Sequence, residues 1–299
     1  MALLSQLRKE LRFNAEFLQL IQTLKNIAAS QYHMLEREKE RFAEFMDSFA
    51  GFFRVVDMAG VDDPLVRSAS DTLGVVMVTS DSGFMGSLNA GVIEAGLEAQ
   101  SLLSDDKVRL VIIGEKGAGR MIERNREFKA FPGINQDTRY EQALEIRDYL
   151  VDEVLNRRMG KVLLVHPRPV SFTQQTIETI QLFPCADLFD HASETEVSAH
   201  AGKRGFLADS RRVVVESAFR DMVQYLSGVW AASKLYEVFE DSKLAEFAAR
   251  AMHLEESAQK LEKDHKKLKH QCFRAAHELV DKSMRESFSS RKKKRRKVA

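Results

Sequence analysis

The sequence contains few cysteines and no long apolar run. Its 299 residues include only two cysteines, Cys185 and Cys272, which lie far apart. Such a pair makes neither a disulfide framework nor a cysteine metal cluster, so a reducing compartment is the simpler prediction. No apolar stretch approaches the ~20 residues that a membrane-spanning helix needs, and early acidic residues argue against a transit peptide. We expect a bacterial chain that is cytosolic or peripheral to a membrane.

Proline and glycine are scarce at both ends of the chain. All 5 prolines lie in the middle, the first glycine is Gly51, and after Gly205 the only glycine is Gly228. Because both residues disfavour helix interiors, this distribution predicts a long helix at each end. A helix over Val213–Phe288 would run about 110 Å, far beyond the three turns of an average globular helix. We expect a helix of that length to project from its domain.

Apolar residues in the last third recur at spacings that alternate between three and four, which indicates a heptad seam that needs a partner helix. The seam comprises Leu244, Phe247, Ala251, Leu254, Ala258, Leu261, His265, Leu268, Cys272, Ala275 and Leu279. Matching positions in the first part of the chain are Ile21, Leu24, Ala28, Leu35, Phe42, Phe45, Phe49 and Phe52. Two ordinary amphipathic helices on a globular core are the alternative, which the predicted length disfavours. His265 is a polar seam residue, and we favour a role in setting helix register over metal binding.

The middle of the chain alternates short apolar strands with helices, which indicates a small, mostly parallel sheet. Strands are predicted at Val75–Thr79, Val108–Gly114, Lys161–His166 and Thr176–Phe183, and helices at Asn89–Leu103, from Gly114 through Ile122, and at Tyr140–Asn156. The predicted fold is a Rossmann-like α/β domain inserted between two coiled-coil helices. The helices cover residues 1–58 and 210–288, the domain covers 70–190, a loop covers 185–212, and a basic tail covers 289–299.

Two loops in the middle invite a chemical interpretation. Gly114 to Gly119 follows a strand and opens a helix, as phosphate-binding loops do, but it has neither the Walker nor the G-x-G-x-x-G spacing. The alternative is that glycine occurs at such a turn only because the backbone conformation requires it. Ser80 to Ser87 lacks a G-x-S-x-G elbow and has no nearby histidine, so a capping turn before Asn89 is favoured over a nucleophile. We therefore expect no catalytic residue, no cofactor and no metal.

The charges are balanced overall but not along the chain. There are 45 basic and 44 acidic residues, and Arg291 to Lys297 are seven consecutive cations. The rest of the chain therefore carries a net charge of −6. The tail resembles a nucleic-acid or import signal, and a solvated terminus is the alternative. Because no other basic patch appears, we expect no nucleic-acid partner.

Three stretches together resemble the gamma subunits of F-type ATP synthases. Ile21 to Ser30 is similar to their I-T-x-A-M-x-M-V-A-A-S segment, Ser80 to Asn89 to S-D-R-G-L-C-G-G-L-N, and Glu246 to Met252 to S-E-x-A-A-R-M. Weaker similarities are Ile113 to Gly117, like I-G-R-K-G, and Phe172 to Gln174 in an F-x-x-x-x-T-Q strand. These segments occur in the family's order and at roughly its spacing.

The chain also departs from that family. Ser82, Met85 and Ser87 replace an arginine, a cysteine and a glycine, and Ala275 to Glu278 stands where the family has R-Q-x-x-I-T. These differences, with the cationic terminus, resemble a divergent or alternate bacterial form. In the family the end of the C-terminal helix sits in an apolar sleeve. Because desolvating seven cations is costly, we expect the tail to protrude into solvent or to meet acidic groups.

The resemblance implies a non-catalytic rotor in the central stalk of a rotary ATP synthase, built on an antiparallel coiled coil. It implies alpha, beta and epsilon subunits and a ring of c subunits as partners, and a peripheral position on the cytoplasmic side of the bacterial inner membrane. It assigns beta-subunit contacts to Leu24, Lys25, Ile27, Ser30, Glu246 and Arg250. Arg250 would pair with a beta carboxylate or, alternatively, within the coiled coil.

Two other functions remain open on the sequence. One is a coiled-coil scaffold or adaptor whose basic tail binds nucleic acid or a membrane surface. The other is a phosphate-binding enzyme that uses Gly114 to Gly119.

Overall fold

The computed structural model describes residues 2–53, 63–100, 104–185 and 218–296. Residues 54–58 of the predicted first helix, Ser101 to Leu103 and most of the predicted loop over 185–212 lie outside the described residues, as do the side chains of Phe42, Phe45, Phe49, Phe52 and Arg291 to Lys297. The chain divides into two compact units. One joins Met1–Ala29 with Ala251–Ala299, and the other is Ser30–Arg250.

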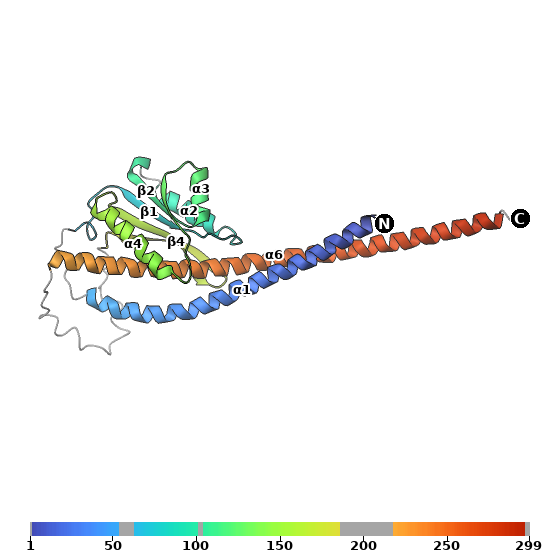
Figure 1. The fold of residues 1–299 in the computed structure, drawn as a ribbon, viewed down its shortest axis with the longest axis horizontal. Coiled ribbons are helices and arrows are strands. Elements are labelled where there is room, and N and C mark those ends of the chain that lie inside the picture. Colours follow the sequence, from blue (N-terminus) through green and yellow to red (C-terminus); the bar gives the residue numbers. More distant parts are fainter. Residues whose placement is uncertain (1, 54–62, 101–103, 186–217, 297–299) are drawn as a thin grey trace. The chain divides into compact units, whose positions relative to one another are not determined.

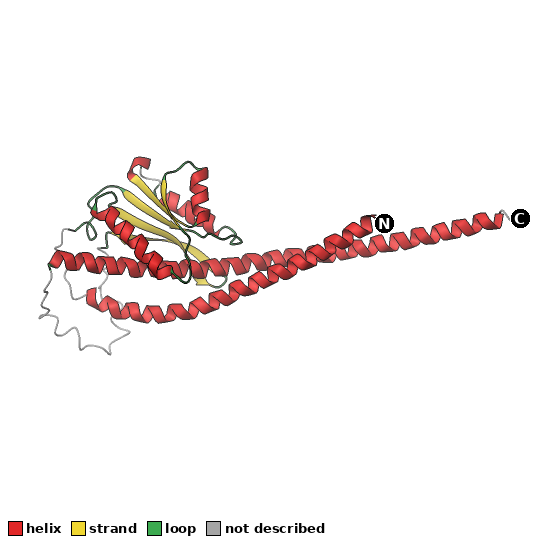
Figure 2. Ribbon diagram, viewed as in Figure 1, coloured by secondary structure: helices red, strands yellow, loops and turns green. Residues whose placement is uncertain are grey.

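Two long helices begin and end the described chain (Figures 1 and 2). Helix α1 spans Ala2–Phe53 and helix α6 spans Phe219–Arg296. The sequence analysis ended the C-terminal helix at residue 288 and began the tail at 289, whereas α6 continues through Arg296. Nothing in Arg291 to Arg296 breaks a helix, because arginine and lysine are good helix formers.

A five-stranded sheet lies in the unit Ser30–Arg250, with strand order β3-β2-β1-β4-β5. The strands are β1 (Leu73–Val78), β2 (Val108–Ile113), β3 (Phe128–Phe131), β4 (Lys161–Ser171) and β5 (Gln174–Phe183). All neighbours run parallel except β4 and β5, which form an antiparallel hairpin. The remaining elements are α2 (Leu88–Ala99), the short 3₁₀ helix η1 (Asp105–Lys107), α3 (Glu115–Glu123) and α4 (Arg139–Leu155).

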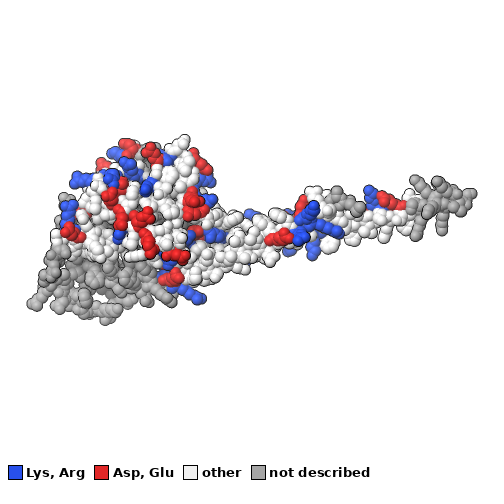
Figure 3. Space-filling model, viewed as in Figure 1, with Lys and Arg blue, Asp and Glu red and all other residues white. Residues whose placement is uncertain are grey.

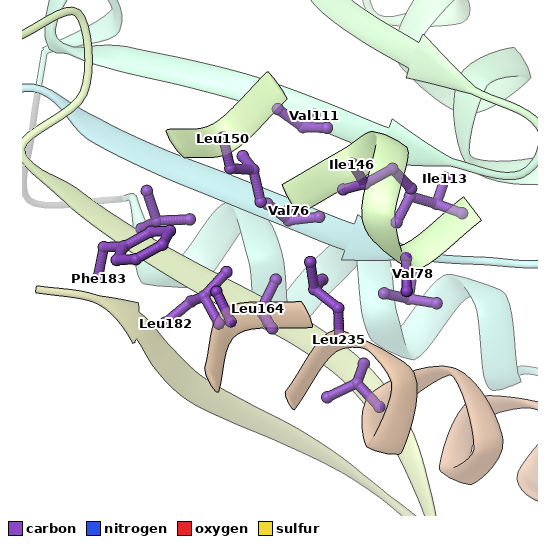
Figure 4. Close-up of a cluster of buried hydrophobic side chains, with 14 of the residues drawn as sticks. Val76, Val78, Val111, Ile113, Ile146, Leu150, Leu164, Leu182, Phe183 and Leu235 are labelled. Carbon is purple, nitrogen blue, oxygen red and sulfur yellow. The ribbon is translucent and has the colours of Figure 1, made fainter. Parts of the chain in front are cut away.

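Both faces of the sheet are covered. Helices α4 and α6 cover one face, where Ile146, Leu150 and Leu235 pack on Val76 and Val111 (Figure 4). Helices α2 and α3 cover the other face through Val92, Ile93 and Met121. Because β1 is buried on both sides, all six of its residues are buried, which is typical of a central parallel strand.

The sequence missed β3 and shortened β4. Strand β3 has only four residues and sits at the sheet edge, so it leaves no periodic apolar signal. Strand β4 continues beyond His166, where the predicted strand ended, through Pro167 and Pro169. Its pairing with β1 ends at Val165, and beyond that point it pairs only with β5. Proline is tolerated there because the strand has become an edge.

Within the unit formed by residues 1–29 and 251–299, α1 and α6 run antiparallel. Asn14 contacts His265 and Lys25 contacts Glu255, so partners move in opposite directions along the two helices. Ile21, Leu254 and Ala258 form the buried core of this pair. Antiparallel packing of apolar seams excludes water from both helices and stabilises each of them.

Candidate functional site

Several of the predicted seam residues of α6 pack against α1. In the unit Ser30–Arg250, Leu244 and Phe247 are buried against Tyr32 and Leu35. In the other unit, Leu254 is buried against Ile21. Over these residues, the face of α6 that carries the heptad spacing packs on α1.

Seam burial decreases toward the end of α6. Leu261 packs at the margin of the Ile21 cluster, and Leu268 and Leu279 are only partly buried. Residues 281–289 are exposed throughout. The end of α6 therefore lacks a covering element within the described chain.

The histidine of the seam has a partner that the sequence analysis missed. His265 Nδ1 lies 3.1 Å from Asn14 Oδ1, and Asn14 is buried. Asn14 stands seven residues before Ile21, so extending the N-terminal heptad backward by one repeat would have found it. A partly buried polar pair of this kind favours one register, because any slip leaves both groups unpaired.

The N-terminal candidate contact residues divide into two sets. Leu24 packs at the margin of the Ile21 cluster, and Lys25 Nζ donates to Glu255 Oε2 over 2.9 Å, so both already contact α6. Ile27 is 49% exposed and Ser30 is also exposed. Only the second pair is exposed, whereas Leu24 and Lys25 are partly buried.

The C-terminal candidate contacts form a compact charged cluster on α6. Arg250 Nη2 donates to Glu246 Oε1 over 2.6 Å, and Lys243 Nζ donates to the other carboxylate oxygen over 2.9 Å. Both cations also lie near the ring of Phe247. Glu246 is buried, and the two cations offset the desolvation of its carboxylate. Arg250 thus pairs within its own helix, and a pairing with another chain stays a prediction.

Exposed apolar residues form a stripe along α1 beside the seam. Phe13, Phe17, Leu20 and Ile27 are exposed and follow a three-four-seven spacing, which places them along one helix face. Phe13 and Phe17 stack on each other, with ring centroids 5.9 Å apart. A contiguous apolar face of this kind is typical of a protein contact surface.

The glycine loop does not offer free donors to a phosphate group. The N–H groups of the first turn of α3 are occupied, because Glu115 donates to Asp81, Lys116 to the Ser80 carbonyl and Gly117 to Thr79 Oγ1. Gly114 has a φ of 99°, and a Cβ there would lie 2.4 Å from the Thr79 carbonyl oxygen. The interpretation as a phosphate loop is therefore wrong, and glycine is required by geometry.

The turn between Ser80 and Asn89 fastens neighbouring strand ends. Asn89 Oδ1 accepts from the Ser80 N–H, and Asn89 Nδ2 donates to Ser80 Oγ. Asp81 also accepts from the Gly133 N–H beyond β3. The side chains of Ser80, Asp81 and Asn89 therefore hold backbone in place. The predicted cap of the following helix is not made by a side chain, because Ser87, the residue before α2, forms no capping hydrogen bond through its hydroxyl.

Three further features were candidates for chemistry or binding: the buried cysteine, metal-ligating side chains and surface charge. Burial raises the pKa of the Cys185 thiol to about 11, so the reactive thiolate is scarce at neutral pH. The described residues contain no cluster of side chains suited to a metal ion. Among those residues, no helix combines the length and apolar character that crossing a membrane requires. On the visible face of the α/β domain both signs of charge are intermixed (Figure 3), whereas nucleic-acid surfaces present a basic field.

Comparison with known sequences finds one family. A family model described as ATP synthase matches residues 4–286. The ATP synthase gamma chain of Maridesulfovibrio salexigens is 25% identical over 243 residues, which is 78% of each chain. The gamma chain of Saccharopolyspora erythraea is 30% identical over 161 residues, which is 52% of each.

Solved structures share the fold. The rotor of the Euglena gracilis mitochondrial ATP synthase contains a chain with a TM-score of 0.62 and 16% identity, and the match covers 93% of this chain and 99% of that one. A chain from the central stalk and c-ring structure of the Tetrahymena thermophila enzyme has a TM-score of 0.60 and 17% identity, and the match covers 80% of this chain and 99% of that one.

Proposed function

This chain belongs to the gamma-subunit family of ATP synthases, and from that premise we propose that it works as a rotating shaft. It is a non-catalytic central-stalk subunit of a rotary ATP synthase. The shaft would couple ion flow through a membrane ring to ATP synthesis or hydrolysis in an alpha/beta hexamer. The observation that carries the proposal is the antiparallel pairing of α1 with α6, through buried seams, in both units.

The geometry suits a transmitter of torque better than a scaffold or an enzyme. Buried leucine and phenylalanine side chains join the two helices, and paired helices resist bending and twisting together. The glycine loop has its first-turn donors occupied, and the serine turn holds backbone. Catalysis on this chain therefore has no support among the described residues.

A rotating shaft would drive catalysis by making different contacts with each catalytic subunit in turn. A contact that favours one conformation of a partner shifts its population, and rotation moves that contact from one subunit to the next. We propose that exposed Ile27 and Ser30, with neighbouring Leu24 and Lys25, make such contacts. We propose the same for Glu246 and Arg250, where Arg250 would exchange its intrahelical carboxylate for one on the beta subunit.

The partners follow from the proposed role. The chain would bind alpha and beta subunits along the helices, and epsilon and the c ring at the α/β domain. The unpartnered stripe of Phe13, Phe17 and Leu20 supports a protein partner along α1. The complex would be bacterial, and this subunit would be peripheral, on the cytoplasmic side of the inner membrane.

The cationic tail would stay outside any apolar sleeve. The family match ends at residue 286, before the run Arg291 to Lys297 begins. Burying seven unpaired cations would cost several kcal/mol each, so we propose that they meet water or acidic groups. Limited trypsin digestion of the assembled complex tests this, and a tail that resists cleavage at high salt contradicts it.

Affinity purification of the tagged chain tests the function itself. Alpha, beta and epsilon subunits are expected in the stoichiometry of the complex. Recovery of other partners would support the scaffold alternative, and nucleotide binding by the chain alone would support an enzyme.

A matched pair of variants tests the contact residues. Arg250→Met and Arg274→Met each remove an arginine that bonds to a glutamate four residues away on α6. If Arg250 contacts a beta subunit, only Arg250→Met lowers the ATP turnover of the assembled complex. Equal turnover in the two variants would argue that the Arg250 pair serves only the helix.

A further inference from the structure

Arg139, the first residue of α4, bonds to both long helices within the unit Ser30–Arg250. Its Nη2 donates to Glu38 Oε2 of α1 over 3.0 Å and to Glu240 Oε1 of α6 over 3.4 Å. Its Nε donates to the Tyr236 hydroxyl over 3.1 Å, and Nη1 donates to the Gln136 carbonyl over 2.7 Å. One planar guanidinium therefore donates to four acceptors at once, whereas a lysine has only three N–H donors.

Packing holds the guanidinium in one orientation. It lies over the ring of Tyr236, with 5.4 Å from the guanidinium carbon to the ring centroid. The Arg139 side chain is only 12% exposed. A buried, stacked arginine has few alternative rotamers, so its hydrogen bonds are directional restraints.

Glu240 depends on this arginine. It is 1% exposed, and its Oε2 is buried with no hydrogen-bond partner among the described residues. Burial raises the pKa of the Glu240 carboxyl, whereas Tyr236 and Arg139 act to lower it. Lys39 acts on Glu240 only at longer range, so removing Arg139 alone would leave a buried carboxylate without its hydrogen-bonded cation, which is far more destabilising than removing both.

A second ion pair lies beside the first. Lys39 of α1 pairs with Asp241 of α6, and Asp241 is 3% exposed. Two neighbouring links thus join α1 to α6. Lys39 bonds directly to Asp241, and Glu38 is linked to Glu240 through Arg139 of α4. A helix turns 100° per residue, so rolling either helix by one position would break both links.

The apolar contacts nearby cannot supply the same restraint. Ala231, Leu235, Val238 and Phe239 of α6 pack on the sheet face (Figure 4 shows Leu235). Apolar burial is non-directional, so a small roll or slide of α6 changes its free energy gradually. Ion pairs in a buried site lose their hydrogen-bond geometry over a short displacement. The best-established role of buried polar groups is to fix the register of packed elements.

We propose that Arg139 is a positioning residue that locks the α/β domain to α1 and α6 against rotation, so that torque applied to the domain reaches both helices. This inference rests on the proposed function as a rotating shaft. It assigns to the link among Glu38, Arg139 and Glu240 a mechanical role that is separate from stability.

The experiment uses the assembled, ion-pumping complex and measures three quantities for each variant. These are the melting temperature, the rate of ATP hydrolysis without load, and ATP-driven pumping against increasing opposing ion gradients. Arg139→Met is compared with the double variant Arg139→Met/Glu240→Gln, which leaves no unpaired buried charge. Arg168→Met is the matched control, because Arg168 forms an exposed pair with Glu178 in the same domain.

Arg139→Met is expected to lower the melting temperature. It is also expected to abolish pumping against opposing gradients at which the wild-type complex still pumps. The double variant is expected to regain much of the melting temperature but not the pumping under load. Arg139→Lys keeps the positive charge but lacks the planar set of N–H donors of a guanidinium. It is expected to lose pumping only under load. Arg168→Met is expected to match the wild type in all three measurements.

Recovery of both melting temperature and loaded pumping in the double variant would overturn the inference, because the link would then serve stability alone. If Arg139→Met prevents assembly, the double variant still decides the matter. A wild-type chain that neither assembles with the other subunits nor supports pumping would refute the proposed function and this inference together.

Discussion

Replacing Leu261 by proline tests whether α6 must be continuous to transmit torque. Leu261 lies well inside α6 (Phe219–Arg296) and packs against the cluster that contains Ile21 and Leu254. Proline removes the hydrogen bond to the carbonyl four residues earlier, and its ring clashes with that carbonyl, which costs about 3 kcal/mol or more. That free energy corresponds to roughly a hundredfold shift from a straight helix toward a kinked or frayed one.

The assay compares ATP hydrolysis with ATP-driven ion pumping in the same assembled complex. Leu261→Pro is expected to retain hydrolysis while pumping falls, because a kinked shaft turns at one end without turning the other. Leu261→Ala is the matched control. It keeps the backbone hydrogen bond, and its packing loss is below the about 2–5 kcal/mol of a fully buried leucine, since Leu261 is only partly buried.

The reasoning is refuted if Leu261→Pro pumps as many ions per ATP as the wild type. It is also refuted if Leu261→Ala uncouples the complex as severely as the proline variant, because lost packing rather than lost helix continuity would then be responsible.

Three further predictions follow from buried or backbone-binding side chains. A thiol reagent should label Cys272, which is partly buried, much faster than buried Cys185, whose pKa is raised to about 11; equal rates would contradict this. Burial lowers the pKa of His166 below about 6.5 despite the opposing Asp241 charge, so the unfolded chain binds the proton more readily and stability should fall as pH drops through about 6.5. Thermal melts should show this slope flattened in His166→Gln. Asp81→Ala should lower the free energy of unfolding by about 0.5–2 kcal/mol through lost backbone caps, whereas Asp81→Asn, which keeps an acceptor oxygen, should lose less. Denaturant titration that ranks the two Asp81 variants in the reverse order would contradict the capping role.

The long helices were predictable because their signals are local and repeated. The absence of proline and glycine at both ends sets where a helix can continue, and the heptad at Leu244, Phe247 and Leu254 marks the face that packs. Each repeat supplies the same information again, so a single irregular position such as His265 does not obscure the pattern. The strands β1 and β2 were found for a similar reason, because each is a short, nearly continuous apolar run.

The glycine loop was less predictable, because one local pattern serves two purposes. Gly114 after a strand and before a helix is equally compatible with a bound phosphate and with a tight turn. The decision lies with Thr79, Ser80 and Asp81, whose oxygens accept the hydrogen bonds of the helix N-terminus. Those residues directly follow β1, and only the parallel pairing of β1 with β2 brings them to the loop after β2.

By itself the sequence determined the two long helices, the face on which each packs, and the family resemblance that implies a rotor. Tertiary structure alone decided that Arg139 joins Glu38 and Glu240, each of which lies 101 residues from it in the chain. The physical reason is that helix continuity and seam spacing depend on neighbours within a few turns. A hydrogen-bonded ion pair depends instead on atoms meeting within about 3 Å, and no local pattern specifies which distant elements the fold will bring together.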